Sequence, residues 1–208
     1  MKIGSGIIWS SIERFGYSGI VFILTIILAR ILKPTDFGLI GTLSLFIGIS
    51  QILIDSGLGG ALIRKKDIKE TDFNTVFTIN LSISVILYIL LFFLAPYISD
   101  FYQNPELSLV LRVLSLSLLF NAISLIGKVR LLRNLEYKKI ALISIISVIS
   151  SGLLSIVAAM YDLGYWALVI QTTCYYFFLS ILLYFFTPIQ LKFGYSKASF
   201  KSLFGFGG

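Results

Sequence analysis

The sequence predicts an all-α, polytopic membrane protein with six transmembrane helices. It contains six apolar stretches, each at least as long as the roughly 20 residues that a helix needs to cross the hydrocarbon layer. Hydrophobic residues make up 57% of the chain and charged residues 13%, whereas soluble proteins are about one quarter charged. Because lipid offers no hydrogen bonds to the backbone, each stretch is expected to be helical.

The stretches follow one another in order with short connections. The first is too long for a cleavable signal peptide and has no small-residue cleavage site, so we expect it to serve as its own insertion signal. Only a few residues around 33–36 separate it from the second, and the 99–106 loop between the third and fourth is also short. The predicted spans are 7–31, 37–63, 73–98, 107–127, 140–161 and 163–186.

Basic residues fall almost entirely on alternate connections. If the N-terminus is cytoplasmic, the outer segments contain only Arg30 and Lys33, and the inner segments hold most of the 17 lysines and arginines. Basic loops stay in the cytosol, so both termini are expected there. This asymmetry explains the net charge of +7 and gives no indication of nucleic-acid binding.

Residues typical of catalysis are scarce. The chain has no histidine, the commonest general base and metal ligand, and no nucleotide-binding or hydrolase motif. Its connections are too short to hold an active site. The sequence therefore predicts no catalytic residues, no metal site and no cofactor.

Four polar residues are expected at one depth, in the cytoplasmic third of four helices. Counting from the cytoplasmic ends places Arg14 roughly 10 Å into the first span. Asp55, Asn80 and Asn121 come to similar levels on the next three spans. Since polar groups in lipid are costly, we expect this layer to line a water-filled cavity that opens toward the cytosol.

Each residue of the layer has an expected role. Arg14 suits an anionic head group because guanidinium pairs with phosphate oxygens in a bidentate way, and Asn80 and Asn121 would bind the same substrate. Asp55 would hold Arg14 when the cavity is empty, or exchange a proton or cation, with Glu13 as a second coupling candidate. Alternatively, Glu13 and Arg14 snorkel to the cytoplasmic interface.

A run of glycines follows Asp55 within the second span. Gly57, Gly59 and Gly60 are poor helix formers. They predict a local break or kink of the kind that transporters place near substrate or ion sites. The alternative is close helix packing through small residues.

Seven segments, taken in order, resemble bacterial polysaccharide-exporting flippases. These are the Wzx-type exporters of the multidrug/oligosaccharidyl-lipid/polysaccharide superfamily. Each motif is weak alone, but their order and spacing are fairly specific and cover nearly the whole chain. The segments are Leu28-Ala29-Arg30-Ile31-Leu32, Pro34-Thr35-Asp36-Phe37-Gly38, Asp55-Ser56-Gly57-Leu58-Gly59, Ala95-Pro96-Tyr97-Ile98 with Phe101-Tyr102, Pro105-Glu106-Leu107, Leu111-Arg112, and Gly164-Tyr165-Trp166-Ala167-Leu168-Val169.

The resemblance implies a function in the bacterial plasma membrane. Members of the family move undecaprenyl-pyrophosphate-linked oligosaccharide from the inner to the outer leaflet, and an ion gradient drives this transport. It implies that Arg14 contacts the pyrophosphate and that Asp55 or Glu13 couples H⁺ or Na⁺. Polysaccharide polymerase or export machinery would be further partners. The six helices would form one of two lobes, with 192–208 as a cytoplasmic basic segment leading to a second, missing lobe.

Other functions stay open at this point. An antiporter of cationic drugs would share the superfamily fold but would need a net acidic cavity. A non-catalytic membrane subunit of glycan assembly, or a membrane-embedded ligase or polymerase, would also suit a polytopic chain. The absence of histidine and of a large outer loop counts against the enzyme.

Overall fold

The computed structural model describes residues 2–55, 57–187 and 192–207. The described residues form α-helices and connections, without strands. Six helical segments among them are long and apolar enough to cross a membrane, which confirms the predicted fold class. The helices are α1 (Lys2–Ile31), α2 (Pro34–Asp55), α3 (Leu58–Arg64), α4 (Glu70–Phe101), α5 (Glu106–Leu114), α6 (Leu116–Arg133), α7 (Tyr137–Met160), α8 (Trp166–Phe186) and α9 (Lys197–Gly207).

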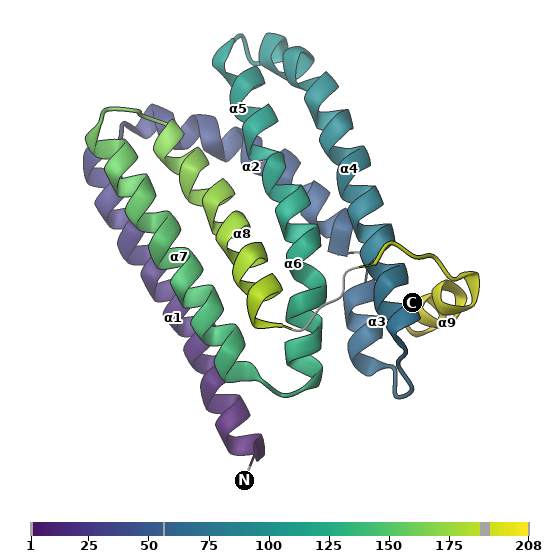
Figure 1. Ribbon diagram of the computed structural model, residues 1–208. Helices are drawn as coiled ribbons and strands as arrows, with labels where there is room; N and C mark the ends of the chain where they lie inside the picture. Colours follow the sequence, from purple (N-terminus) through teal and green to yellow (C-terminus); the bar gives the residue numbers. More distant parts are fainter. Residues whose placement is uncertain (1, 56, 188–191, 208) are drawn as a thin grey trace.

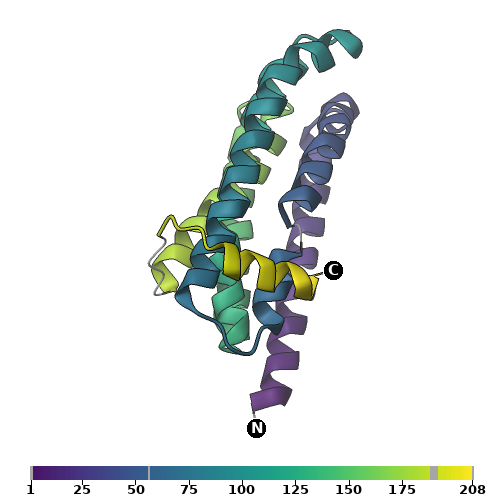
Figure 2. The same ribbon diagram turned by 90° about the vertical axis from the view of Figure 1, so that its right-hand side faces the viewer.

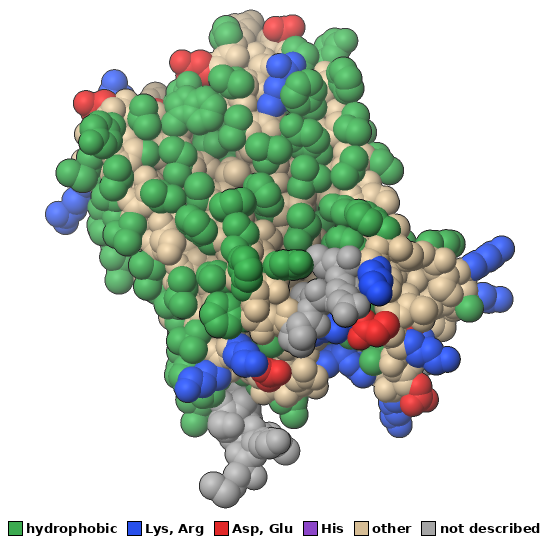
Figure 3. Space-filling model, in the orientation of Figure 1, with side chains coloured by type: hydrophobic (Ala, Val, Ile, Leu, Met, Phe, Trp, Pro, Cys, Tyr) green, Lys and Arg blue, Asp and Glu red, His purple; other side chains and the backbone are tan. Residues whose placement is uncertain are grey.

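The helices pack as an elongated bundle (Figure 1). α1 packs along α7, α7 along α8, and α8 along α6, while α4 contacts both α5 and α6. Close approach of α1 and α7 depends on Gly152, because a Cβ atom there would lie 2.4 Å from the Leu24 side chain. Hydrophobic side chains cover the middle of the face drawn in Figure 3, and charged side chains gather toward its two ends. This distribution suits a protein surrounded by lipid.

Two of the predicted spans each consist of two helices. The second is divided at Gly57, whose φ of 74° lies in the left-handed region that favours glycine. The interruption is narrower than the glycine run suggested, because Gly59 and Gly60 are helical residues of α3. The fourth is divided at Ser115, whose hydroxyl donates to the Arg112 carbonyl at 2.9 Å. Such side-chain bonds compete with the helical backbone ladder.

Several helices extend beyond the predicted apolar limits. α4 begins at Glu70 and ends at Phe101, and α6 continues to Arg133. Apolar content marks only the part of a helix that lies in hydrocarbon, so the polar turns at each end escape that criterion. The extension of α6 places Lys128 on a helix, although the sequence had assigned it to a loop.

The short helix α3 is fixed by contacts from its neighbours. The Arg133 Nη1 atom donates to the carbonyl oxygens of Leu62, Ile63 and Lys65 at 2.6, 3.0 and 2.8 Å. These carbonyls end the helix and lack partners within it. Figure 2 shows α9, part of the basic segment 192–208, lying across α3 and α4. The Lys65 ammonium also bonds Ser202 of α9 at 3.0 Å.

Arg112 has a structural position, since it joins two helices. Its Nε atom donates to the Phe92 carbonyl oxygen at 3.3 Å, and its guanidinium carbon lies 4.3 Å from the centre of the Phe92 ring. Both contacts join α5 to α4, and the cation–π contact offsets part of the cost of placing this charge in a span.

Gly57→Ala should destabilise the protein by about 1 kcal/mol, because alanine disfavours the left-handed conformation. Gly60→Ala is the matched control: Gly60 is helical and an added Cβ meets no atom within 4 Å. Alanine there should be neutral or stabilise by up to about 1 kcal/mol. Thermal unfolding of both variants in detergent measures the difference, and equal melting temperatures would contradict the role given to Gly57.

Candidate functional site

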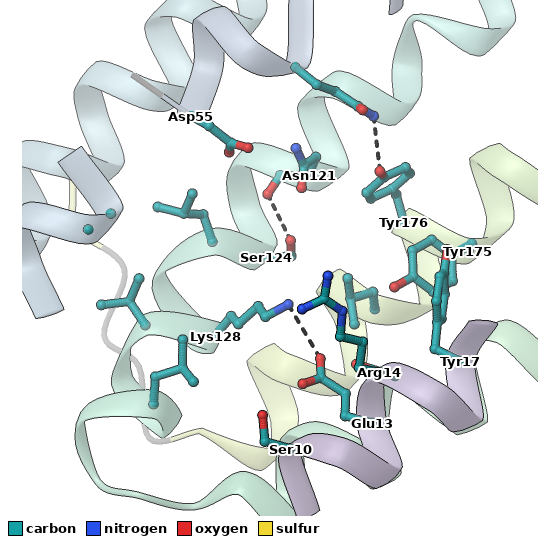
Figure 4. A pocket seen from close by; sticks show the side chains of 18 of the residues that line it. Ser10, Glu13, Arg14, Tyr17, Asp55, Asn121, Ser124, Lys128, Tyr175 and Tyr176 are labelled. Atoms are coloured by element: carbon teal, nitrogen blue, oxygen red, sulfur yellow. Dashed lines mark hydrogen bonds and ion pairs between the residues drawn. The ribbon is translucent and has the colours of Figure 1, made fainter. Parts of the chain in front are cut away.

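A polar cavity of about 660 Å³ lies among α1, α2, α3, α6, α7 and α8. Figure 4 shows its charged and aromatic side chains reaching toward one another from different helices. Its lining combines charged residues, tyrosines, serines and amides within helices that are otherwise apolar. The polar residues are Ser10, Glu13, Arg14, Tyr17, Ser18, Gln51, Asp55, Asn121, Ser124, Lys128, Ser144, Tyr175 and Tyr176.

Most of the residues singled out from the sequence meet here. Arg14 and Glu13 come from α1, Asp55 from the last turn of α2 and Asn121 from α6. Gly59 and Gly60 of α3 also line the cavity, so backbone without side chains forms part of its wall. Gly57, at the junction of α2 and α3, is not a lining residue.

The expectation that Asn80 lines the same cavity as Arg14 was wrong, because Asn80 is not among the lining residues. It is fully buried in α4, and neither its amide nitrogen nor its amide oxygen has a hydrogen-bond partner in the part of the chain that the structure describes. Counting residues from the helix end fixes the depth of a side chain but not the face of the helix that carries it. Asn80 therefore does not share the cavity that contains Arg14.

The charge pairing also differs from the expectation. Glu13 pairs with Lys128, with 3.5 Å between Oε1 and Nζ. No ion pair joins Arg14 to Asp55 within the described residues, where the sequence suggested one. The Glu13 and Lys128 side chains are 22% and 47% exposed, so their pair contributes at most about 1 kcal/mol to stability. Two opposite charges thus stay available for a ligand.

Sequence reasoning missed several lining residues, among them one lysine and three tyrosines. Lys128 was assigned to a loop, although it lies five residues before Arg133, the last residue of α6. Tyr17, Tyr175 and Tyr176 looked like ordinary apolar-face residues. They form an aromatic cluster, with ring centres 5.4 Å apart for Tyr17 and Tyr175 and 5.1 Å apart for Tyr175 and Tyr176.

Gln51 links this cluster to α2. Its Nε2 atom donates to the Tyr176 hydroxyl oxygen at 3.0 Å, a hydrogen bond of the kind that polar side chains form between membrane helices. Figure 4 shows the bond at the far end of the cavity from Glu13 and Lys128. We call the part of the cavity around Glu13 and Lys128 the ionic end and the part around Tyr176 the aromatic end, although Asp55 also lies toward Tyr176.

This arrangement can bind an anion and neutral polar groups. Arg14 and Lys128 supply charged donors, while the tyrosines and Asn121 supply hydrogen bonds and flat apolar rings. No group of three or more potential metal-ligating residues occurs in the described parts of the chain. The fold and the cavity together define a helical membrane protein with a polar cavity between its spans.

The chain belongs to the family described as "Polysaccharide biosynthesis protein", whose model matches residues 27–208. It is 32% identical over 162 residues to the teichuronic acid biosynthesis protein TuaB of Bacillus subtilis. It is 26% identical over 158 residues to the lipopolysaccharide biosynthesis protein WzxC of Escherichia coli, and 27% identical over 163 residues to the succinoglycan biosynthesis transport protein ExoT of Rhizobium meliloti.

These alignments cover 77%, 76% and 78% of this chain but 34%, 32% and 33% of the relatives. The chain thus spans about a third of the length of the curated relatives it matches. No solved structure gives a significant match. The comparisons confirm the family resemblance seen in the sequence.

The Gln51–Tyr176 hydrogen bond should be measurable as a coupling free energy. We expect about 0.6 kcal/mol, the average found for hydrogen bonds between membrane helices, from a double-mutant cycle of Gln51→Leu and Tyr176→Phe. Unfolding in mixed micelles supplies the four stabilities. Strictly additive single effects would show that the bond does not hold α2 to α8.

Proposed function

We propose that this protein takes part in flipping undecaprenyl-pyrophosphate-linked oligosaccharide across the bacterial plasma membrane, for surface polysaccharide biosynthesis. The six spans would form one lobe of a longer transporter, with both termini of this chain in the cytosol. The observation that carries the proposal is the cavity holding Arg14, whose guanidinium has no ion-pair partner among the described residues. The names of ExoT and WzxC, a transport protein and a lipopolysaccharide biosynthesis protein, support it.

The pyrophosphate would bind at the ionic end of the cavity. Guanidinium holds phosphate oxygens through two parallel hydrogen bonds, and an ammonium adds a second positive charge. Arg14 and Lys128 reach into the same space in Figure 4. Binding would draw Lys128 from Glu13 toward the phosphate, since the diphosphate carries more charge than one carboxylate. The lipid tail would stay outside, between helices.

The glycan would lie toward the aromatic end. Tyr17, Tyr175 and Tyr176 offer ring faces for the apolar faces of sugars, and Asn121 offers both a donor and an acceptor for hydroxyl groups. A mixture of a few directional polar groups with flat apolar surface is typical of sites for small polar molecules.

Asp55 is the stronger candidate for coupling to H⁺ or Na⁺. Glu13 is engaged by Lys128, whereas the Asp55 carboxylate has no ion-pair partner among the described residues. Asp55 also ends α2, two residues before the left-handed Gly57. Neutralising its charge would change the cavity at the joint between α2 and α3, which is where a helix pair can change its angle.

The main alternative, an antiporter of cationic drugs, fits less well. Such a transporter needs a net acidic cavity, but here Arg14 and Lys128 offset Glu13 and Asp55. A non-catalytic subunit of glycan assembly would have no need for an unpaired arginine at this depth, where charge is costly.

Arg14→Ala in the full-length protein should lower surface polysaccharide at least tenfold, because a lost bond to a charged group is worth about 1.5 kcal/mol or more. Mass spectrometry should show undecaprenyl-pyrophosphate-linked oligosaccharide accumulating in the cells, as in a strain that lacks the gene. Arg64→Ala, at an exposed arginine outside the cavity, is the matched control and should export normally.

Membrane insertion of each variant is checked by immunoblotting of the membrane fraction. Normal surface polysaccharide in an inserted Arg14→Ala protein would refute the role of Arg14. An unchanged level of lipid-linked glycan in the deletion strain would refute the flippase itself.

A further inference from the structure

A second polar cavity, of about 540 Å³, lies at the opposite end of the bundle. It forms where the α1–α2, α4–α5 and α7–α8 connections meet, near the end away from the N-terminus in Figure 1. Segments that gave the family resemblance converge on this cavity, although they are far apart in the sequence. The flipping mechanism proposed above leaves it without a role.

The walls of this cavity are fixed by local contacts. The Lys33 backbone N–H donates to Asp36 Oδ2 at 3.0 Å, and the Glu106 backbone N–H donates to Asn104 Oδ1 at 3.1 Å. Gly164, with φ of 55°, closes against the same Asp36: a Cβ atom there would lie 3.4 Å from Oδ1. The Asp36 and Asn104 side chains are thus held in place before any ligand arrives, which lowers the entropy cost of binding to them.

Opposite charges line the cavity without neutralising one another. Lys33, Asp36 and Glu106 all face it, yet none of them takes part in an ion pair within the described residues. The Asn104 amide nitrogen likewise donates to no protein acceptor in the described part of the chain. The charged side chains therefore line the cavity without pairing with one another.

Two tyrosines complete the lining. Tyr165 is partly buried beside Trp166, with ring centres 5.8 Å apart, and Tyr102 extends from the end of α4. Burial raises the pKa of Tyr165, and the negative charge of Glu106 and a side-chain hydrogen bond with Glu106 add to the effect. Tyr161 differs: it is 77% exposed, as expected of an aromatic residue at a membrane interface.

We infer that this second cavity binds the sugar hydroxyls of the glycan on the release side of the lobe. Hydroxyls donate to Asp36 and Glu106 and accept from Lys33 and Asn104, while the tyrosine rings cover the apolar face of a sugar. An anion fits less well beside two carboxylates, and the described residues offer no cluster of three metal ligands. The inference rests on the proposed function, because the cargo must carry sugar.

The test measures protection of an engineered cysteine in intact cells. Thr35→Cys, in a Cys174→Ala background, places a single thiol of this chain at the exposed rim of the cavity. A membrane-impermeant maleimide should label it several-fold more slowly in cells that make the lipid-linked glycan than in cells lacking the first sugar transfer onto the lipid. Tyr161→Cys, outside the cavity, should label equally in both.

Glu106→Gln, added to the Thr35→Cys, Cys174→Ala protein, should remove the protection of the thiol from maleimide. It should also lower export about tenfold, the effect of one lost hydrogen bond to a charged group. Asp67→Asn, at an exposed carboxylate away from both cavities, is the matched control for export. Equal labelling of Thr35→Cys in both strains would overturn the inference even if the deletion strain accumulates lipid-linked glycan. Without that accumulation, the proposed function fails and this inference with it.

Discussion

Placing a charged side chain in the hydrocarbon layer costs roughly 3 kcal/mol or more, and this penalty organises the structure around its cavity. Glu13, Arg14, Asp55 and Lys128 come from three helices and converge on one space. Each of these charges on an isolated helix would be a liability in lipid. In the cavity these charges have access to water and to the hydrogen-bonding groups of the surrounding serines and tyrosines, and Glu13 and Lys128 form an ion pair. Packing of the helices therefore creates the polar space that the charges need.

The interrupted second span follows from the same constraint. A helix break frees backbone groups that lipid cannot satisfy, so it is tolerated only beside a cavity or a protein partner. Here Gly59 and Gly60 face the cavity, and Arg133 binds the carbonyls at the end of α3. The break therefore lies between Asp55 and an anchored short helix.

The sequence predicted the fold class and much of the cavity for different reasons. Hydropathy and length are strong signals, so the six spans are confirmed, and costly residues such as Arg14 and Asp55 stand out against an apolar background. Helix faces are not encoded so plainly. Asn80 is buried and does not line the cavity, and the tyrosine cluster depends on how α1 and α8 pack. Lys128 was missed because polar helix ends look like loops.

The charged layer should border water inside the bundle, and labelling of engineered thiols is the sharpest test of this property. In a Cys174→Ala background, Asn121→Cys places a thiol in the cavity. Leu153→Cys places one on α7 at a side chain that is 59% exposed on the surface of the bundle. A water-soluble maleimide reacts with thiolate, which forms only where water reaches. The account predicts rapid labelling at position 121 and little at 153. Failure of both positions to react would contradict a water-filled cavity.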